Sequence, residues 1–176
     1  FNGLFYFIIF FFKNVCKPEF YVVQTGSLVK ELQQVGNFNK QFVQRMVSLL
    51  REWKVKLKEH NADYFSKQDI EKRKGIVDAM NIAPQLGALQ TMVTLSKCML
   101  YGIDFSKFIE EVYVGSKWKK WMYTNTADNK MLCAIITGHY HFASNSYKEI
   151  MKQLEEREDI RETIINEVMG VIDHYE

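Results

Sequence analysis

The sequence has little proline, little cysteine and almost no net charge. Its 176 residues include 2 prolines, 3 cysteines and 9 glycines, and 23 basic against 21 acidic residues leave a formal charge of +2. This balance argues against a strongly basic nucleic-acid wrapper. A hydrophobic content of 47% excludes a disordered tail. The length supports one globular domain or at most two small ones.

The three cysteines are spread along the chain at Cys16, Cys98 and Cys133. Their small number excludes a secreted miniprotein held by disulfides. No CxxC pair occurs, which excludes a zinc knuckle and a thioredoxin-like redox motif. Cys98 and Cys133 lie inside apolar runs, where a free cysteine behaves as a small buried hydrophobe. We therefore expect an intracellular protein in a reducing compartment.

Sequence motifs of catalysis and cofactor binding are also missing. The glycines are dispersed, with no GxGxxG and no Walker loop, and no GxSxG elbow occurs. His139 and His141 form the only close histidine pair, and no third ligand stands at metal-binding spacing. We predict no catalytic residue, no metal site and no cofactor. An all-α enzyme whose catalytic residues are distant in sequence stays an alternative.

The most hydrophobic stretch is residues 4–12. It is too short to span a bilayer as a helix, which takes roughly 20 apolar residues. No basic residue precedes it, as a signal peptide would require. We expect residues 1–26 to form a hydrophobic arm, extended or β, that inserts into a partner or a membrane. The inserting side chains would be Phe5, Phe7, Ile8, Phe10, Phe11 and Phe12. Alternatively, the stretch is the remainder of a longer targeting or membrane segment.

From Ser27 onward, apolar residues recur at helical spacings of three and four. The expected helices cover 27–36, 38–60, 67–81, 82–100, 104–115 and 131–136, followed by two that open at Ser146 and Asp159. Ser66 with Asp69, and Ser146 with Glu149, have the form of capping boxes. We predict an all-α single domain over residues 27–176. Its architecture would be a bundle, or stacked helical hairpins, of six to eight helices.

The helix expected over 82–100 has an unusual composition, because residues 82–96 contain no charged side chain. A helix that is apolar nearly all round belongs in the centre of a bundle. Gln85 and Gln90 would then point inward. A cavity beside them would make the protein a small-ligand carrier or a helical enzyme.

Charge is distributed unevenly along the chain. Residues 1–120 hold 18 basic and 11 acidic residues, giving +7, whereas residues 121–176 hold 5 and 10, giving −5. Such asymmetry steers association with other molecules. On the expected helix over 38–60, Arg51, Lys54 and Lys58 belong to a basic face that would bind a partner.

Two tryptophans with basic neighbours form the most specific surface feature. Trp118 and Trp121 are three residues apart and share one face of a helix. The flanking lysines are Lys117, Lys119 and Lys120. Tryptophan is enriched at the centres of protein interfaces, so we expect this segment to bind a protein partner. A membrane surface is an alternative, and the near-zero net charge disfavours nucleic acid.

We interpret the chain as a non-catalytic helical adaptor or a subunit of a larger protein assembly. It would bind partners through the hydrophobic arm and through the basic and aromatic helical surface. A homo-oligomer is one form of such an assembly. The first alternative is a peripheral membrane protein anchored by residues 4–12. The second is an enzyme or small-ligand carrier with a cavity at the 82–100 helix.

Overall fold

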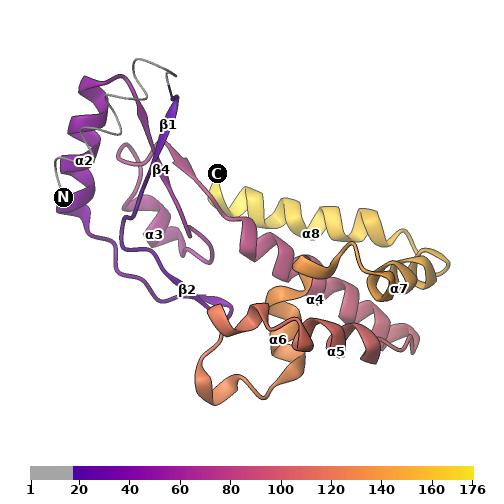
Figure 1. The fold of residues 1–176 in the computed structure, drawn as a ribbon. Helices are drawn as coiled ribbons and strands as arrows, with labels where there is room; N and C mark the ends of the chain where they lie inside the picture. Colours follow the sequence, from indigo (N-terminus) through magenta and orange to yellow (C-terminus); the bar gives the residue numbers. More distant parts are fainter. Residues whose placement is uncertain (1–17) are drawn as a thin grey trace.

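The computed structural model describes residues 18–176 (Figure 1). The expected inserting residues of the arm, Phe5 to Phe12, lie outside the described residues. Residues 18–82 form an α/β region, and residues 83–176 form a helical region. Most of the described chain is helical, which confirms a mainly helical protein. The strict all-α prediction is wrong, because a small parallel sheet occupies the first region.

The α/β region is built on a three-stranded parallel sheet with the order β1-β4-β5. Its elements are β1 (Phe20–Val23), β2 (Val29–Lys30), β3 (Gln33–Gln34), α2 (Lys40–Glu52), β4 (Lys56–Glu59), α3 (Lys67–Glu71) and β5 (Ala79–Met80). In the register, Tyr21 is opposite Leu57 and Val23 is opposite Glu59. Helix α2 packs its Val43 on Val23 and Leu57 of the sheet, so one face of the sheet is covered.

Of the three helices expected in this region, two are shorter than predicted and one is wrong. The helix expected over 38–60 ends at Glu52, because Lys54 has a positive φ of 57° and the chain then enters β4. Segment 27–36 forms the β2–β3 hairpin instead of a helix. The helix expected over 67–81 ends at Glu71, followed by turns and β5. Its opening is confirmed, since Ser66 and Asp69 form the expected capping box.

The helical region follows the sequence pattern closely. Its elements are α4 (Ala83–Tyr101), α5 (Ser106–Val114), α6 (Lys130–Thr137), α7 (Asn145–Glu155) and α8 (Ile160–Tyr175), with short 3-10 helices η1 (Lys117–Lys120), η2 (Thr124–Thr126) and η3 (Gly138–His141). Gly102, with a φ of 66°, ends α4 in the left-handed conformation that glycine adopts without strain. Asp159 caps α8 as expected, but Ser144 rather than Ser146 caps α7.

Two helices join the regions (Figure 1). Helix α4 starts directly after β5 and runs through the helical region, where its Leu95 packs with Phe108 of α5 and Leu154 of α7. Helix α8 lies along α4, and its C-terminal end reaches α3 of the α/β region. Within residues 18–176, no helix is both long enough and apolar enough to cross a membrane.

Candidate functional site

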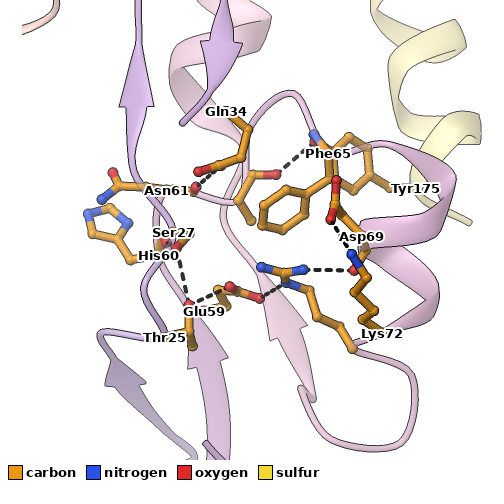
Figure 2. Close-up of polar contacts among 12 residues, drawn as sticks. Thr25, Ser27, Gln34, Glu59, His60, Asn61, Phe65, Asp69, Lys72 and Tyr175 are labelled. Carbon is orange, nitrogen blue, oxygen red and sulfur yellow. Dashed lines mark hydrogen bonds and ion pairs between the residues drawn. The ribbon is translucent and has the colours of Figure 1, made fainter. Parts of the chain in front are cut away.

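Polar side chains converge where β1 and β4 end (Figure 2). Thr25 follows β1 and Glu59 ends β4, and both are fully buried. The Thr25 hydroxyl donates a hydrogen bond to the Glu59 carboxylate. The neighbouring Ser27 hydroxyl donates to the carbonyl oxygen of His60 at 2.6 Å. Open parallel sheets bind ligands outside the carboxyl ends of their strands, so this edge is the first place to search for a site.

Arg73 provides the counter-charge to Glu59. Its Nε donates to Glu59 Oε2 at 2.6 Å, and its Nη1 donates to the carbonyl oxygen of Asp69 at 2.8 Å. The guanidinium carbon lies 4.2 Å from the centre of the Phe38 ring and 3.8 Å from that of Phe65. The residue is only 2% exposed. A buried pair of this kind is strongly destabilised when one partner is removed, because the other charge stays in the interior.

A cavity of about 470 Å³ adjoins this ion pair. Its walls come from the segment after β1, including Asn37 and Lys40, and from the segment after β4, including Ser66, Lys72 and Arg73. Both segments leave the sheet at the carboxyl ends of the strands. The volume lies in the range of small-molecule sites in proteins, about 300–1,000 Å³.

The loop over residues 60–66 is held by bonds from both regions. Gln34 Nε2 donates to the carbonyl oxygens of Asn61, at 3.0 Å, and Asp63, at 3.1 Å. From α8, the Tyr175 hydroxyl donates to the carbonyl oxygen of Ala62 at 2.7 Å. The loop therefore connects the sheet to the C-terminal helix.

Within this loop, Asp63 caps α4 from a distance. Its Oδ1 accepts a hydrogen bond from the Gln85 backbone N–H at 2.7 Å, in the first turn of α4. Ile82, at the N-cap position, offers no side-chain acceptor there. The Asp63 side chain is buried, and its Oδ2 makes no hydrogen bond within the described structure. Burial raises the pKa of this carboxyl group, since a carboxylate is costly to desolvate.

On the second face of the β1-β4-β5 sheet, no element within residues 18–176 packs over β1. Phe20 and Val22 of β1 point to this face and are 37% and 48% exposed. Lys56 and Lys58 are their register partners on β4. Lys56 forms a surface ion pair with Glu19 at 2.8 Å, whereas Lys58 makes no ion pair with any described residue. In the described part of the chain, β1 and β5 each pair with β4 alone.

The predicted tryptophan surface is placed differently from the expectation. Trp118 and Trp121 are each 8% exposed and pack with Val29 and Cys133 in one hydrophobic cluster. The Trp118 ring also stacks on Tyr113, with centroids 5.1 Å apart. The flanking lysines, Lys117, Lys119 and Lys120, are exposed. The part of this segment that another molecule reaches is therefore its lysines.

The predicted basic face is divided among three elements. Arg51 lies in the last turn of α2, 3.8 Å from Asp78 Oδ1. Lys54 follows the end of that helix, and Lys58 lies on β4. Because the helix ends at Glu52, the structure does not bring these three cations onto one helical face. Lys58 alone belongs to the open face of the sheet.

The two glutamines of α4 have separate environments. The Gln85 side chain accepts a hydrogen bond from the Tyr64 backbone N–H at 2.7 Å. Gln90 donates to the Tyr147 hydroxyl at 3.0 Å and lines a cavity of about 290 Å³. Charged residues, including Lys148 and Arg161, border this cavity, whereas the carrier hypothesis predicts an apolar one.

The histidine pair lies in η3 next to Glu111 of α5. His141 Nδ1 is 3.4 Å from Glu111 Oε1, and the Ser146 hydroxyl donates to the other oxygen of this carboxylate. Serine therefore bonds the carboxylate rather than a histidine, so these residues form no nucleophile–base pair. Burial lowers the pKa of His139, which contacts Gly87 of α4. Residues 18–176 contain no cluster of three ligands that fits a metal ion.

The two described cysteines are free and buried. Burial raises the pKa of the Cys98 thiol to about 11 and also raises that of Cys133. A raised pKa favours the protonated thiol, which is the less reactive form. The prediction that these cysteines act as small hydrophobes is confirmed.

Sequence patterns did not predict the four residues at the centre of the polar cluster, Thr25, Glu59, Asp63 and Arg73. They are separated by up to 48 positions and match no motif. One local signal was present: Lys56, Leu57, Lys58 and Glu59 alternate between polar and apolar, which favours a strand. A strand ending at Glu59 would have directed attention to the residues that follow it.

No family model and no curated protein matches this chain. Among solved structures, the fold is similar to "Crystal structure of a probable tagatose 6 phosphate kinase from Sinorhizobium meliloti 1021", with a TM-score of 0.58 and 14% sequence identity. The similarity covers 86% of this chain and 43% of that chain. At this identity it shows the fold alone. The chain thus spans less than half the length of the structure that it resembles.

Proposed function

We propose that the chain is a non-catalytic adaptor or a subunit of a larger protein assembly. In this proposal, a partner polypeptide covers the open face of the β1-β4-β5 sheet, defined by Phe20, Val22, Lys56 and Lys58. The observation that carries the proposal is that, among the described residues, α2 covers one face of this parallel sheet while Phe20 and Val22 on the other face are exposed.

Parallel sheets in proteins are almost always buried on both faces. Here the side chains of Phe20 and Val22 are more than a third exposed. Covering them contributes about 25 cal/mol for each Å² of apolar surface removed from water. The pairing arrangement favours the same conclusion, because β1 and β5 each present one unpaired edge in the described chain. Open edges are templates for another strand.

The chemistry of the face defines the partner. A partner segment that covers the face needs apolar side chains to pack on Phe20 and Val22. It also needs acidic side chains near Lys58, which has no anionic partner among the described residues. The proposed partner is therefore a polypeptide that presents an extended, apolar and acidic segment to this face.

The other predicted contact regions fit this role as secondary contacts. The exposed lysines Lys117, Lys119 and Lys120 offer positive charge to the same kind of acidic partner. The arm around residues 4–12 lies outside the described residues and stays a prediction.

Site-specific photo-crosslinking tests the proposal. A photoreactive amino acid replaces Val22 in the full chain, which is expressed in the cells that make the protein. The control carries the same group at Val114 on α5, which is 70% exposed. We expect a crosslink from position 22, not from 114, to an extended segment of another protein. Lys58→Glu should weaken this crosslink by repulsion, and Lys107→Glu, a matched exposed lysine on α5, should not.

Each result has a clear meaning. Equal crosslinking from positions 22 and 114, or none from position 22, contradicts a partner on this face. A crosslink from position 22 to a second copy of the chain replaces the proposed partner with a homo-oligomer. Insensitivity to Lys58→Glu contradicts the acidic character of the partner.

A further inference from the structure

The Arg73 guanidinium has more hydrogen-bond donors than the described protein satisfies. A guanidinium carries five N–H donors in one plane. Two of them are used, one from Nε to Glu59 and one from Nη1 to the Asp69 carbonyl oxygen. No described residue accepts a hydrogen bond from Nη2. The Nη2 atom is not one of the buried atoms that lack a partner, so its N–H groups reach solvent although the residue is only 2% exposed.

The surroundings of Arg73 restrict where that acceptor lies. Phe38 and Phe65 lie close to the guanidinium carbon, at 4.2 and 3.8 Å from their ring centres. Glu59 and the Asp69 carbonyl occupy part of its edge. Because Arg73 also lines the 470 Å³ cavity, a molecule that enters the cavity can accept hydrogen bonds from its unused donors.

The charges around the cavity select an anionic acceptor. Lys40, Lys72 and Arg73 line it against one acidic side chain, Asp69. The Asp69 carboxylate is already bonded to the Ser66 hydroxyl and lies 3.2 Å from Lys72 Nζ. Lys40 has no ion pair with a described residue. Guanidinium groups bind carboxylate and phosphate oxygens with two parallel hydrogen bonds.

We propose that the cavity between Phe38, Lys40, Lys72 and Arg73 is a binding site for a small molecule with a phosphate or carboxylate group. The unused N–H groups of Arg73 bind the oxygen atoms of this group. Lys40 and Lys72, which come from the two segments that line the cavity, supply the remaining positive charge. This site does not involve the open sheet face. A negative result for the proposed partner would therefore leave this proposal unaffected, and the reverse also holds.

Titration of the full chain with inorganic phosphate, and separately with acetate, tests the site by NMR. We expect saturable shifts of the Arg73 Nε–H signal and of the amides of Asn37, Ser66 and Lys72. The double variant Lys40→Gln/Lys72→Gln should weaken binding roughly tenfold or more, since each charge-assisted hydrogen bond contributes on that scale. The matched variant Lys107→Gln/Lys119→Gln, on the helical region, should bind normally.

The two probes separate the two kinds of ligand. Saturation by phosphate alone assigns the site to phosphate groups, and saturation by acetate alone assigns it to carboxylates. Absence of saturable shifts for both ions contradicts the site. Equal weakening by Lys40→Gln/Lys72→Gln and by Lys107→Gln/Lys119→Gln also contradicts the site. The ions would then be attracted by the overall charge of the protein rather than bound in the cavity. Arg73→Lys retains the charge opposite Glu59 but loses the planar donors, and should also weaken binding.

Discussion

The α/β region over residues 18–82 and the helical region over residues 83–176 bury their side chains in different ways. In the helical region, helices surround a closed core in which Leu95, Phe108 and Leu154 are at most 1% exposed. In the α/β region, one face of the sheet packs on α2 and the other face is open. The helical region therefore has a closed core, although its surface also carries exposed apolar side chains such as Leu100 and Val114.

The buried polar groups differ in the same way. In the helical region they are mainly hydroxyls that bond their own helix, such as Thr94 to the Gln90 carbonyl oxygen at 2.8 Å and Thr137 to that of Cys133 at 2.7 Å. In the α/β region they include the charged or titratable Glu59, Asp63 and Arg73 beside the hydroxyls of Thr25 and Ser27. Hydroxyls bonded this way need no distant partner. Buried charged groups need a partner that is distant in sequence. The α/β region therefore depends on contacts between segments far apart in sequence.

The largest expected effect is in the closed core. Phe108→Ala removes a fully buried ring and should lower the free energy of unfolding by about 3–5 kcal/mol. Chemical denaturation measures this loss. The exposed control Val114→Ala should change it by less than about 0.5 kcal/mol. A small loss for Phe108→Ala would mean that the helical region is not a closed, well-packed core.

The ion pair of the α/β region should come next. Glu59→Gln leaves the Arg73 charge buried without its partner and should cost about 3 kcal/mol. The double variant Glu59→Gln/Arg73→Met should recover part of that loss in the same denaturation experiment. If Glu59→Gln alone is neutral, charge pairing does not hold this region together.

In acidic solution, the pH dependence of stability should have opposite signs for Asp63 in the α/β region and Glu111 in the helical region. Burial raises the Asp63 pKa above its ordinary 3.8, so the folded state binds this proton more tightly than the unfolded state. Its contribution to stability is full below pH 3.8 and is lost as the pH rises through the raised pKa. The stability of the wild type relative to Asp63→Asn should therefore fall as the pH rises. A difference that is constant or rising would contradict the assigned environment of Asp63.

Glu111 in the helical region provides the opposite case and serves as the comparison. The Ser146 hydroxyl, with a smaller effect from His141, lowers its pKa below the ordinary 4.5. Its contribution is present above pH 4.5 and is lost as the pH falls through the lowered pKa. The stability of the wild type relative to Glu111→Gln should therefore rise with pH over the same acidic range.

The smallest expected effect is common to both regions. Asn39 caps α2 and Asp159 caps α8, each through a side-chain oxygen that accepts a backbone N–H. Replacing either by alanine should cost about 1 kcal/mol. Thermal denaturation of Asn39→Ala and Asp159→Ala measures both. A much larger loss for Asn39→Ala would show that the cap has a further role in the α/β region.

The same contrast explains what the sequence revealed. Helices α4, α5, α6 and α8 were predictable because caps and apolar spacing are local signals. Parallel pairing of β1 with β4 joins residues 36 positions apart. Local sequence patterns do not predict such pairing. The run that starts at Phe38 fits a helix, and nothing in its spacing shows that Lys54 turns the chain toward a strand. The partners of Arg73 depend on that strand, so the candidate site could not be predicted.

Residue-resolved amide hydrogen exchange of the isolated full chain tests the central contrast most directly. The account predicts slow exchange in α4 and α6, where closed packing protects the backbone, and much faster exchange in β1 and β5, whose outer edges lack a strand among the described residues. Protection of β1 and β5 equal to that of α4 and α6 would contradict an open sheet that requires a partner.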